Sequence, residues 1–437
     1  MLRIGSGAGF SGDRFEPARH LIKYGDLDYL VLETLAERTI SIAQLEKLNN
    51  PSKGYDPFLE RRIKDLLPLI KKHNVRIITN MGAANPEEAA KKIIEISKQI
   101  KIPCKVAVVI GDDVLDKIDL NGLDIENQRR LLSYGTPISA NAYLGVEALI
   151  PALKSDADII ITGRVADSSL FLAPQVYHYN WSLNDFQRLG QGTIIGHLLE
   201  CAGQITGGYY SDMERKIVPG IERLGFPYAE IDSKGVAVIS KVDGTGGIIN
   251  SMTVKEQLLY EIHNPEEYVT PDVVADFSKV EIKEVGHNKV KVIGGNGRKK
   301  TDMLKVSVGY HNGYLGEAEI SYGGANALKR AKMAGMIIEK RLKDIIKNLK
   351  IDYIGISSLH YQEENIKETP REIRLRVAGR HEKKQVANLI CEEVEALYLN
   401  GPAAGGGVRK SIKESIRIVS TLMNRNKVES KVKLLSW

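Results

Sequence analysis

The chain has 437 residues, of which 43% are hydrophobic, so a large core and two domains are expected. Its 61 basic and 55 acidic residues leave a net charge of +6 and are mixed along the chain, unlike the concentrated basic face of a nucleic-acid-binding protein. No apolar run reaches the roughly 20 residues of a membrane span, and no signal-peptide pattern opens the sequence. Three scattered cysteines form no metal-binding pair. We expect a cytoplasmic protein without nucleic-acid or membrane partners, for which the small positive excess suits an anionic substrate. Abundant Ile, Lys and Glu indicate a thermophilic source.

Apolar strands alternate with helices over the first part of the chain. Residues 2–8 predict a strand that enters a glycine-rich turn, and a helix follows from Glu16. Further buried strands are expected at 29–32, 75–79, 105–110 and 159–162, and the segment 138–145 precedes another helix. This alternation predicts an α/β fold whose mostly parallel sheet has flanking helices. Polar residues follow the strands and should gather at one rim of the sheet.

The pattern of apolar and polar residues changes near residue 276. Alternating strands come next, then a Lys-rich helix at about 326–349, a strand at 372–379 and a helix at 384–397. This pattern predicts a smaller α+β domain. We therefore divide the chain into an α/β domain, 1–272, that carries the polar strand ends, and an α+β domain, 273–437.

Several polar residues lie where a ligand site of such a sheet would form. Arg164 and Asp167 follow the strand 159–162, where a guanidinium can grip a carboxylate or phosphate; a structural ion pair is the alternative. Glu37 lies one turn from Glu33, so that one carboxyl could become an acid or could cap a helix. Asp112, directly after a strand, could contact a ligand or cap a helix. The glycine-rich turn with Gly7 and Gly9 could bind an anion or be a structural turn, whereas the charged pair Asp13 and Arg14 just past the strand end is expected at the ligand crevice. Lys241, beside a glycine-rich loop, could hold a phosphate or be an exposed lysine without a role.

The segment Gly196–Gln204 predicts a helix with an unusual polar face. His197, Glu200, Cys201 and Gln204 share that face, which carries no lysine. A His and a carboxylate one turn apart suit general acid–base chemistry; a solvent-exposed face or a satisfied core histidine is the alternative. A metal site would need a third ligand that the sequence does not identify.

The sequence also resembles a known family in motifs spread along nearly the whole chain. These motifs are GFSGDR, LAERTI, TNMGAANP, GDD, ANAYLG, TGRVADSSLFLAP, GHLLECAGQITGG, EQLLYEIHNPEEY, TPDVVADFS and GPAAGGGVR. Together they resemble the acyclic terpene utilisation AtuA family. The resemblance implies a setting in which neighbouring steps act on branched acyl-CoA thioesters, with a lyase or hydratase acting on a 3-hydroxy acyl-CoA as the conjectured reaction. The polar motif positions that it transfers to this chain are Asp13, Arg14, Glu37, Asn80, Asp112, Asn141, Arg164, Asp167, His197, Glu200 and Lys241.

The expected function is that of an enzyme acting on an acyl-CoA or another carboxylated small molecule. His197, Glu200, Glu37 and Asp167 are the candidate catalytic residues, and the remaining candidates would bind substrate. No cofactor and no metal ligand is assigned, although a divalent metal held by His197 and Glu200 stays an alternative, as does a non-catalytic metabolite-binding or scaffold subunit. A homo-oligomer is expected from the apolar faces.

Overall fold

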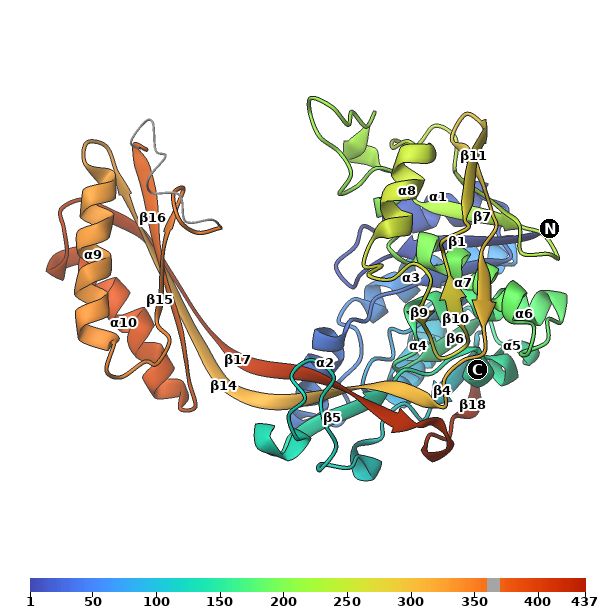
Figure 1. Ribbon diagram of the computed structural model, residues 1–437, viewed down its shortest axis with the longest axis horizontal. Coiled ribbons are helices and arrows are strands. Elements are labelled where there is room, and N and C mark those ends of the chain that lie inside the picture. The colour runs from blue at the N-terminus through green and yellow to red at the C-terminus, as the bar shows by residue number, and fades with distance from the viewer. Residues whose placement is uncertain (360–369) are drawn as a thin grey trace. The chain divides into compact units, whose positions relative to one another are not determined.

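The computed structural model describes residues 1–359 and 370–437, and these fold into two compact units (Figure 1). Residues 1–309 and 418–437 form the first unit, and residues 310–417 form the second. Each unit has its own apolar core. Two long strands, β14 (Met303–Gly323) and β17 (Gly405–Asn424), have residues in both units.

A sheet of ten described strands organises the first unit, in the order β11-β12-β8-β7-β1-β2-β3-β6-β4-β18. Its centre is parallel and consists of β1 (Leu2–Ala8), β2 (Tyr29–Leu32), β3 (Arg76–Thr79), β6 (Ile159–Thr162) and β4 (Lys105–Ile110). The sequence predicted these five strands nearly to the residue, because strands buried on both faces read as continuous apolar runs.

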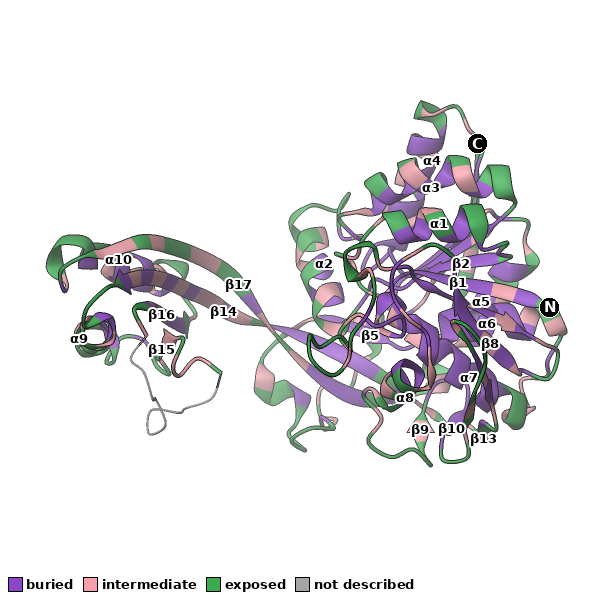
Figure 2. Ribbon diagram, turned by 90° about the horizontal axis from the view of Figure 1, so that it is seen from above, coloured by how far each residue is buried: buried purple, intermediate pink, exposed green. Residues whose placement is uncertain are grey.

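Helices cover both faces of the parallel centre. Successive strand residues point to opposite faces, so that Ile160 packs with one layer of helices while Ile159 and Ile161 pack with the other. The first layer holds α5 (Val146–Lys154), α6 (Asp167–Tyr179) and α7 (Phe186–Glu200), and the second holds α1 (Glu16–Tyr24), α3 (Leu59–His73) and α4 (Pro86–Gln99). Figure 2 shows the central strands buried between these layers.

The sheet is mixed, and the expectation of a mostly parallel sheet is not confirmed. Antiparallel strands flank the centre on both sides: β7 (Pro227–Ile231), β8 (Ala237–Lys241), β12 (Lys289–Ile293) and β11 (Glu281–Gly286) follow one another beyond β1, and β18 (Lys431–Ser436) pairs with β4. The parallel prediction rested on strand–helix alternation, which ends before these strands begin. Short strands joined by turns favour antiparallel pairing.

Smaller elements complete the first unit. They are α2 (Glu37–Asn49), α8 (Ser251–Leu259), β5 (Pro137–Ala142), which pairs with β14, and a three-stranded sheet of β9 (Tyr268–Val269), β10 (Val274–Asp276) and β13 (Asn296–Arg298). None of the helices in the described residues has the length and apolar character needed to cross a lipid bilayer.

The second unit is an antiparallel sheet with two helices. The strand order is β15-β16-β14-β17, with β15 at Lys350–Ile354 and β16 at Glu372–His381. Helices α9 (Ala327–Leu342) and α10 (Lys384–Asn400) share an apolar core with β14 and β16. The compact unit begins at 310 rather than 273, because β11 and β12 pair into the ten-stranded sheet of the first unit.

Candidate functional site

The carboxyl ends of the central strands bring polar residues together at one rim of the sheet. Glu33 follows β2, Asn80 follows β3, Asp112 follows β4 and Arg164 follows β6. Each contacts at least one residue from a neighbouring strand end. Parallel strands deliver their ends to the same edge, so residues that are far apart in sequence become neighbours here.

Arg164 lies at the middle of this rim and is only 1% exposed. One terminal nitrogen, Nη1, donates a hydrogen bond to the backbone oxygen of Leu35, and the other, Nη2, lies 3.0 Å from Oδ1 of Asp167. The guanidinium stacks over the ring of Tyr143, with 4.2 Å from its carbon to the ring centroid. Its Nε has no hydrogen-bond acceptor among the described residues. A buried cation with a spare donor is equipped to bind an anion or a carbonyl oxygen.

Asp112 and Asn141 fix the backbone of Arg164. Oδ2 of Asp112 accepts hydrogen bonds from the Arg164 amide and from the Asn141 side chain, both at 2.9 Å. A Cβ on Gly163 would lie 2.5 Å from Oδ1 of Asp112, so a glycine is needed there. Burial raises the pKa of Asp112 to about 6, against the two hydrogen bonds that lower it. This carboxyl is therefore a positioning group beneath Arg164.

Glu33 is a second buried carboxyl of the rim. Its Oε1 accepts hydrogen bonds from the Leu35 amide at 2.8 Å and from the Asn80 side chain at 2.9 Å. Asn80 in turn accepts from the amide of Thr34. Burial, reinforced by the negative charge of Asp167, raises the pKa of Glu33 well above its usual range. Burial thus favours the protonated form of the Glu33 carboxyl.

Asp167 is the carboxyl of the centre that combines a shifted pKa with access to solutes. Its Oδ1 is buried against Arg164, while the side chain as a whole keeps 37% exposure. Burial of this oxygen and the neighbouring Glu200 raise the pKa of Asp167 to about 7, although Arg164 opposes the shift. A carboxyl that titrates near neutral pH can both accept and donate a proton during a reaction.

Glu37 remains ionised in this setting. Burial acts to raise its pKa, but Arg164, a hydrogen bond from the Tyr143 hydroxyl and Lys305 lower it to about 2. Lys305 lies 3.2 Å from Oε1 of Glu37 and 4.9 Å from the centre of the Tyr143 ring. A carboxylate held so firmly in its charged form orients its neighbours and cannot supply a proton at neutral pH.

His197 and Glu200 form a buried pair on α7. Nδ1 of His197 lies 2.9 Å from Oε1 of Glu200, and Nε2 lies 2.9 Å from the backbone oxygen of Gln257 in α8. A carbonyl oxygen only accepts, so Nε2 carries a proton. Burial lowers the pKa of His197, but the charge and hydrogen bond of Glu200, together with the Gln257 carbonyl and the charge of Glu261, raise it by more, and the net direction is upward. Both ring nitrogens already have protein partners and the residue is 1% exposed, which makes it a link between two helices.

The glycine-rich turn after β1 is packed and internally bonded. A Cβ on Gly7 would lie 2.7 Å from Leu32, and one on Gly9 would lie 2.6 Å from the backbone of Cys201. Asp13 accepts the amide of Gly9 at 3.0 Å and that of Arg14 at 2.8 Å. Close packing explains both glycines. The carboxylate of Asp13 already accepts hydrogen bonds from the backbone amides that a bound anion would need.

Two basic candidates are also engaged by backbone oxygens. Arg14 donates through Nη1 to the oxygen of Glu222 at 2.8 Å. Lys241 is 4% exposed and donates to the oxygen of Thr245 at 2.8 Å, within its own loop. The structure thus brings Asn80, Asp112, Asn141, Arg164, Asp167 and Glu37 into one centre, and leaves Lys241 and Arg14 outside it.

Sequence reasoning missed Tyr143 and Lys305. Tyr143 stands in the ANAYLG motif, but nothing in the sequence places an aromatic ring against Arg164. Lys305 lies on β14, in a strand whose alternation resembles an ordinary half-exposed strand. Only the pairing of β5 with β14 brings this lysine to the rim.

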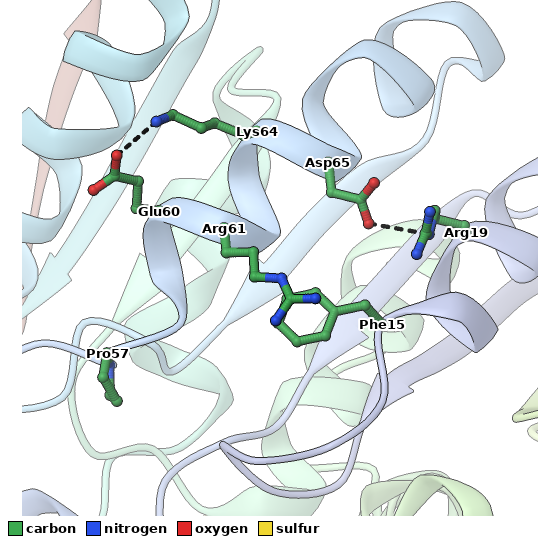
Figure 3. Close-up of a pocket in the computed structure, with 7 residues that line it drawn as sticks. All are labelled: Phe15, Arg19, Pro57, Glu60, Arg61, Lys64 and Asp65. Atoms are coloured by element: carbon green, nitrogen blue, oxygen red, sulfur yellow. Dashed lines mark hydrogen bonds and ion pairs between the residues drawn. The ribbon is translucent and has the colours of Figure 1, made fainter.

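One surface hollow lies apart from this centre. An open hollow of about 680 Å³ between α1 and α3 is lined by residues already paired with each other, such as Arg19 with Asp65 at 3.1 Å and Lys64 with Glu60 at 2.6 Å (Figure 3). Arg61 stacks on Phe15, 4.3 Å from the ring centroid. Within residues 1–359 and 370–437, no group of three His, Cys, Asp or Glu residues has an arrangement suited to a metal ion.

Comparison with known protein families shows to which family the chain belongs. Residues 2–434 match the family described as acyclic terpene utilisation family protein AtuA. The chain belongs to this family. No curated protein and no solved structure matches it significantly. The match spans both compact units, so the whole architecture described above is that of an AtuA family member.

Proposed function

We propose that this AtuA family protein is a lyase or hydratase that acts on a 3-hydroxy acyl-CoA, or a related carboxylated molecule, from acyclic terpene breakdown. The observation that supports the proposal is the pairing of buried Arg164 with Asp167. A cation with an unused donor lies 3.0 Å from a carboxyl whose pKa is near 7. Proton transfer next to a stabilised oxyanion is what such a reaction requires.

The proposed roles follow from access and protonation state. In the dehydration direction, ionised Asp167 removes the proton from the carbon next to the thioester, and Arg164 stabilises the negative charge that develops on the carbonyl oxygen. Asp167 then passes this proton to the departing 3-hydroxyl group, which leaves as water. The enoyl thioester is the other product, and Asp167 returns to its ionised form.

These roles replace the acid–base pair expected from the sequence. His197 has no free ring nitrogen, because Glu200 and Gln257 occupy both. Glu37 is held as a carboxylate by Arg164, Tyr143 and Lys305. In the proposal Glu37 and Tyr143 position the guanidinium, and His197 with Glu200 supports the helix that closes the centre.

Turnover by the Asp167→Asn variant tests the proposal. The purified protein is incubated with straight and branched 3-hydroxy acyl-CoA thioesters, and products are identified by mass spectrometry. General acid–base groups contribute roughly 10²–10⁴-fold to rate, so Asp167→Asn should lower kcat by about that factor while Arg164 keeps a hydrogen-bond acceptor beside it.

Asp113→Asn is the matched control, since Asp113 is an exposed carboxyl on the same rim and should leave turnover unchanged. Full activity in Asp167→Asn would contradict the assigned role. Binding of thioesters without any turnover by the wild-type protein would instead indicate a metabolite-binding subunit.

A further inference from the structure

A second hollow, of about 410 Å³, opens beside the turn that follows β1. Its floor includes Gly9 and Cys201, whose backbones approach closely because Gly9 has no side chain. Phe10, Tyr209 and Ile221 stand among its walls. The volume lies within the range of small-molecule sites, about 300–1,000 Å³.

Several apolar side chains that line this hollow are exposed. Phe10 is 60% exposed, Tyr209 is 84% exposed and Ile221 is 41% exposed. Tyr209 also meets Tyr260 edge to face, with 6.3 Å between ring centroids. Clustered exposed apolar side chains around a concavity mark binding sites, because each would gain free energy if covered.

One polar group in the hollow lacks a partner. Nε2 of Gln204 is buried and finds no hydrogen-bond acceptor in residues 1–359 or 370–437. A buried donor without an acceptor costs free energy. A ligand oxygen atom within the hollow would satisfy it.

The hollow borders the charged centre of the first unit. Cys201, on its floor, directly follows Glu200. Gly9, also on its floor, follows Ala8, whose backbone oxygen accepts a hydrogen bond from the amide of Glu33 at 3.1 Å. A ligand on this floor would therefore lie next to the strand end that carries Glu33.

We propose that this hollow binds the apolar chain of the substrate, with an oxygen atom of the ligand accepting a hydrogen bond from Gln204. The inference rests on the proposed function, which places the carboxyl or thioester end of the substrate at Arg164 and Asp167. It adds the place on the protein where the extended or branched hydrocarbon chain of that substrate binds.

A smaller hollow on the other side of the turn provides the rival site. It measures about 140 Å³ and is lined by residues that include Leu35, Ile42 and Asp56. Its volume is below the usual range of ligand sites. Ile42 is 41% exposed, the same fraction as Ile221, so the two isoleucines form a matched pair.

The experiment compares Ile221→Trp with Ile42→Trp in the full-length protein. Binding of 3,7-dimethyloctanoic acid, a branched chain, and of butyric acid, a short one, is measured by isothermal titration calorimetry. Ile221→Trp should fill the hollow and weaken binding of the branched acid by roughly tenfold or more, about 1.4 kcal/mol. Butyric acid should bind Ile221→Trp as it binds the wild-type protein, and Ile42→Trp should bind both acids normally.

Weaker binding of the branched acid by Ile42→Trp alone would overturn the proposal, as would failure of the wild-type protein to prefer the branched acid. Gln204→Leu gives an independent measurement. It should weaken binding of 7-hydroxy-3,7-dimethyloctanoic acid, whose hydroxyl lies on the distal part of the chain, more than that of the unsubstituted acid; an equal effect on both acids would overturn the role of Gln204. These binding measurements do not require turnover. If the acids bind as expected but no turnover is found, the proposed function fails and the proposed binding site does not.

Discussion

The protonation of each carboxyl at the rim depends on the cations and donors within its reach. Glu37 meets Arg164, Tyr143 and Lys305 and stays ionised, with a pKa of about 2. Asp112 receives only neutral donors, and burial raises its pKa to about 6. Carboxyl groups around the same arginine are therefore held in different protonation states.

The raised pKa of Asp112 makes stability depend on pH. A carboxyl with a folded pKa above its unfolded value of 3.8 stabilises the fold fully below pH 4, and this contribution is lost as pH rises through about 6. A shift of about two units corresponds to roughly 3 kcal/mol. Asp112→Asn should therefore reduce the decline in unfolding free energy between pH 4 and 7, measured by urea titration. Asp116→Asn, at an exposed position, should keep the wild-type slope, and an unchanged slope in Asp112→Asn would show that the buried carboxyl does not titrate as described.

The sequence predicted the strand-end residues of the site because their positions follow from local pattern alone. Apolar runs identified β2, β3, β4 and β6, and the residues after them had to meet at one edge. The environment of each side chain could not be predicted in this way. Whether Arg164 faces Tyr143 or water, and whether a carboxyl keeps its proton, depends on contacts between separate segments, such as those of Leu35 with Arg164 and of Glu37 with Lys305.

At the scale of elements, His197 shows how a polar helix face can serve packing. The face predicted on 196–204 exists, but α7 ends at Glu200 and its histidine points into a layer that includes Phe277, with ring centroids 5.4 Å apart. Helical periodicity identifies residues on one face and gives no indication of what covers it.

His197→Leu should destabilise the fold and leave the chemistry in place. Removing one partner of a buried charged pair costs about 3–5 kcal/mol, here by leaving Glu200 and the oxygen of Gln257 without their donor. The double variant His197→Leu with Glu200→Met should recover part of this loss in urea unfolding. The residual activity of folded His197→Leu should keep the wild-type pH profile. If His197→Leu had wild-type stability but no turnover, His197 would have to be assigned a catalytic role.

The whole molecule differs from the sequence expectation in how the chain is divided. The sequence shows a change of residue pattern near 276, but the strands that follow it, β11 and β12, extend the sheet of the first unit. The chain then enters the second unit through β14 and leaves it through β17, so that its last strand, β18, pairs with β4. Composition reports the local type of structure; it does not report the partner with which a strand pairs.

The charged centre belongs entirely to the first unit, and Lys305 shows the role of connectivity in building it. This residue lies in the part of β14 that precedes position 310. It reaches Glu37 because β5, which leads to Tyr143, pairs with the same strand. Residues from five strand ends and from β14 thus complete one site.

A thermal-shift measurement with Arg164→Lys tests the central claim most directly. A ligand that binds the native state raises the melting temperature in proportion to RT ln(1 + [L]/Kd). Wild-type protein should show a rise with 3-hydroxy acyl-CoA thioesters. Arg164→Lys should lose most of it, because a lysine keeps the charge without the planar set of donors. Arg38→Lys, at an exposed position on α2, should keep the full rise. An equal rise in Arg164→Lys and wild-type protein would contradict the assignment of this centre as the substrate site.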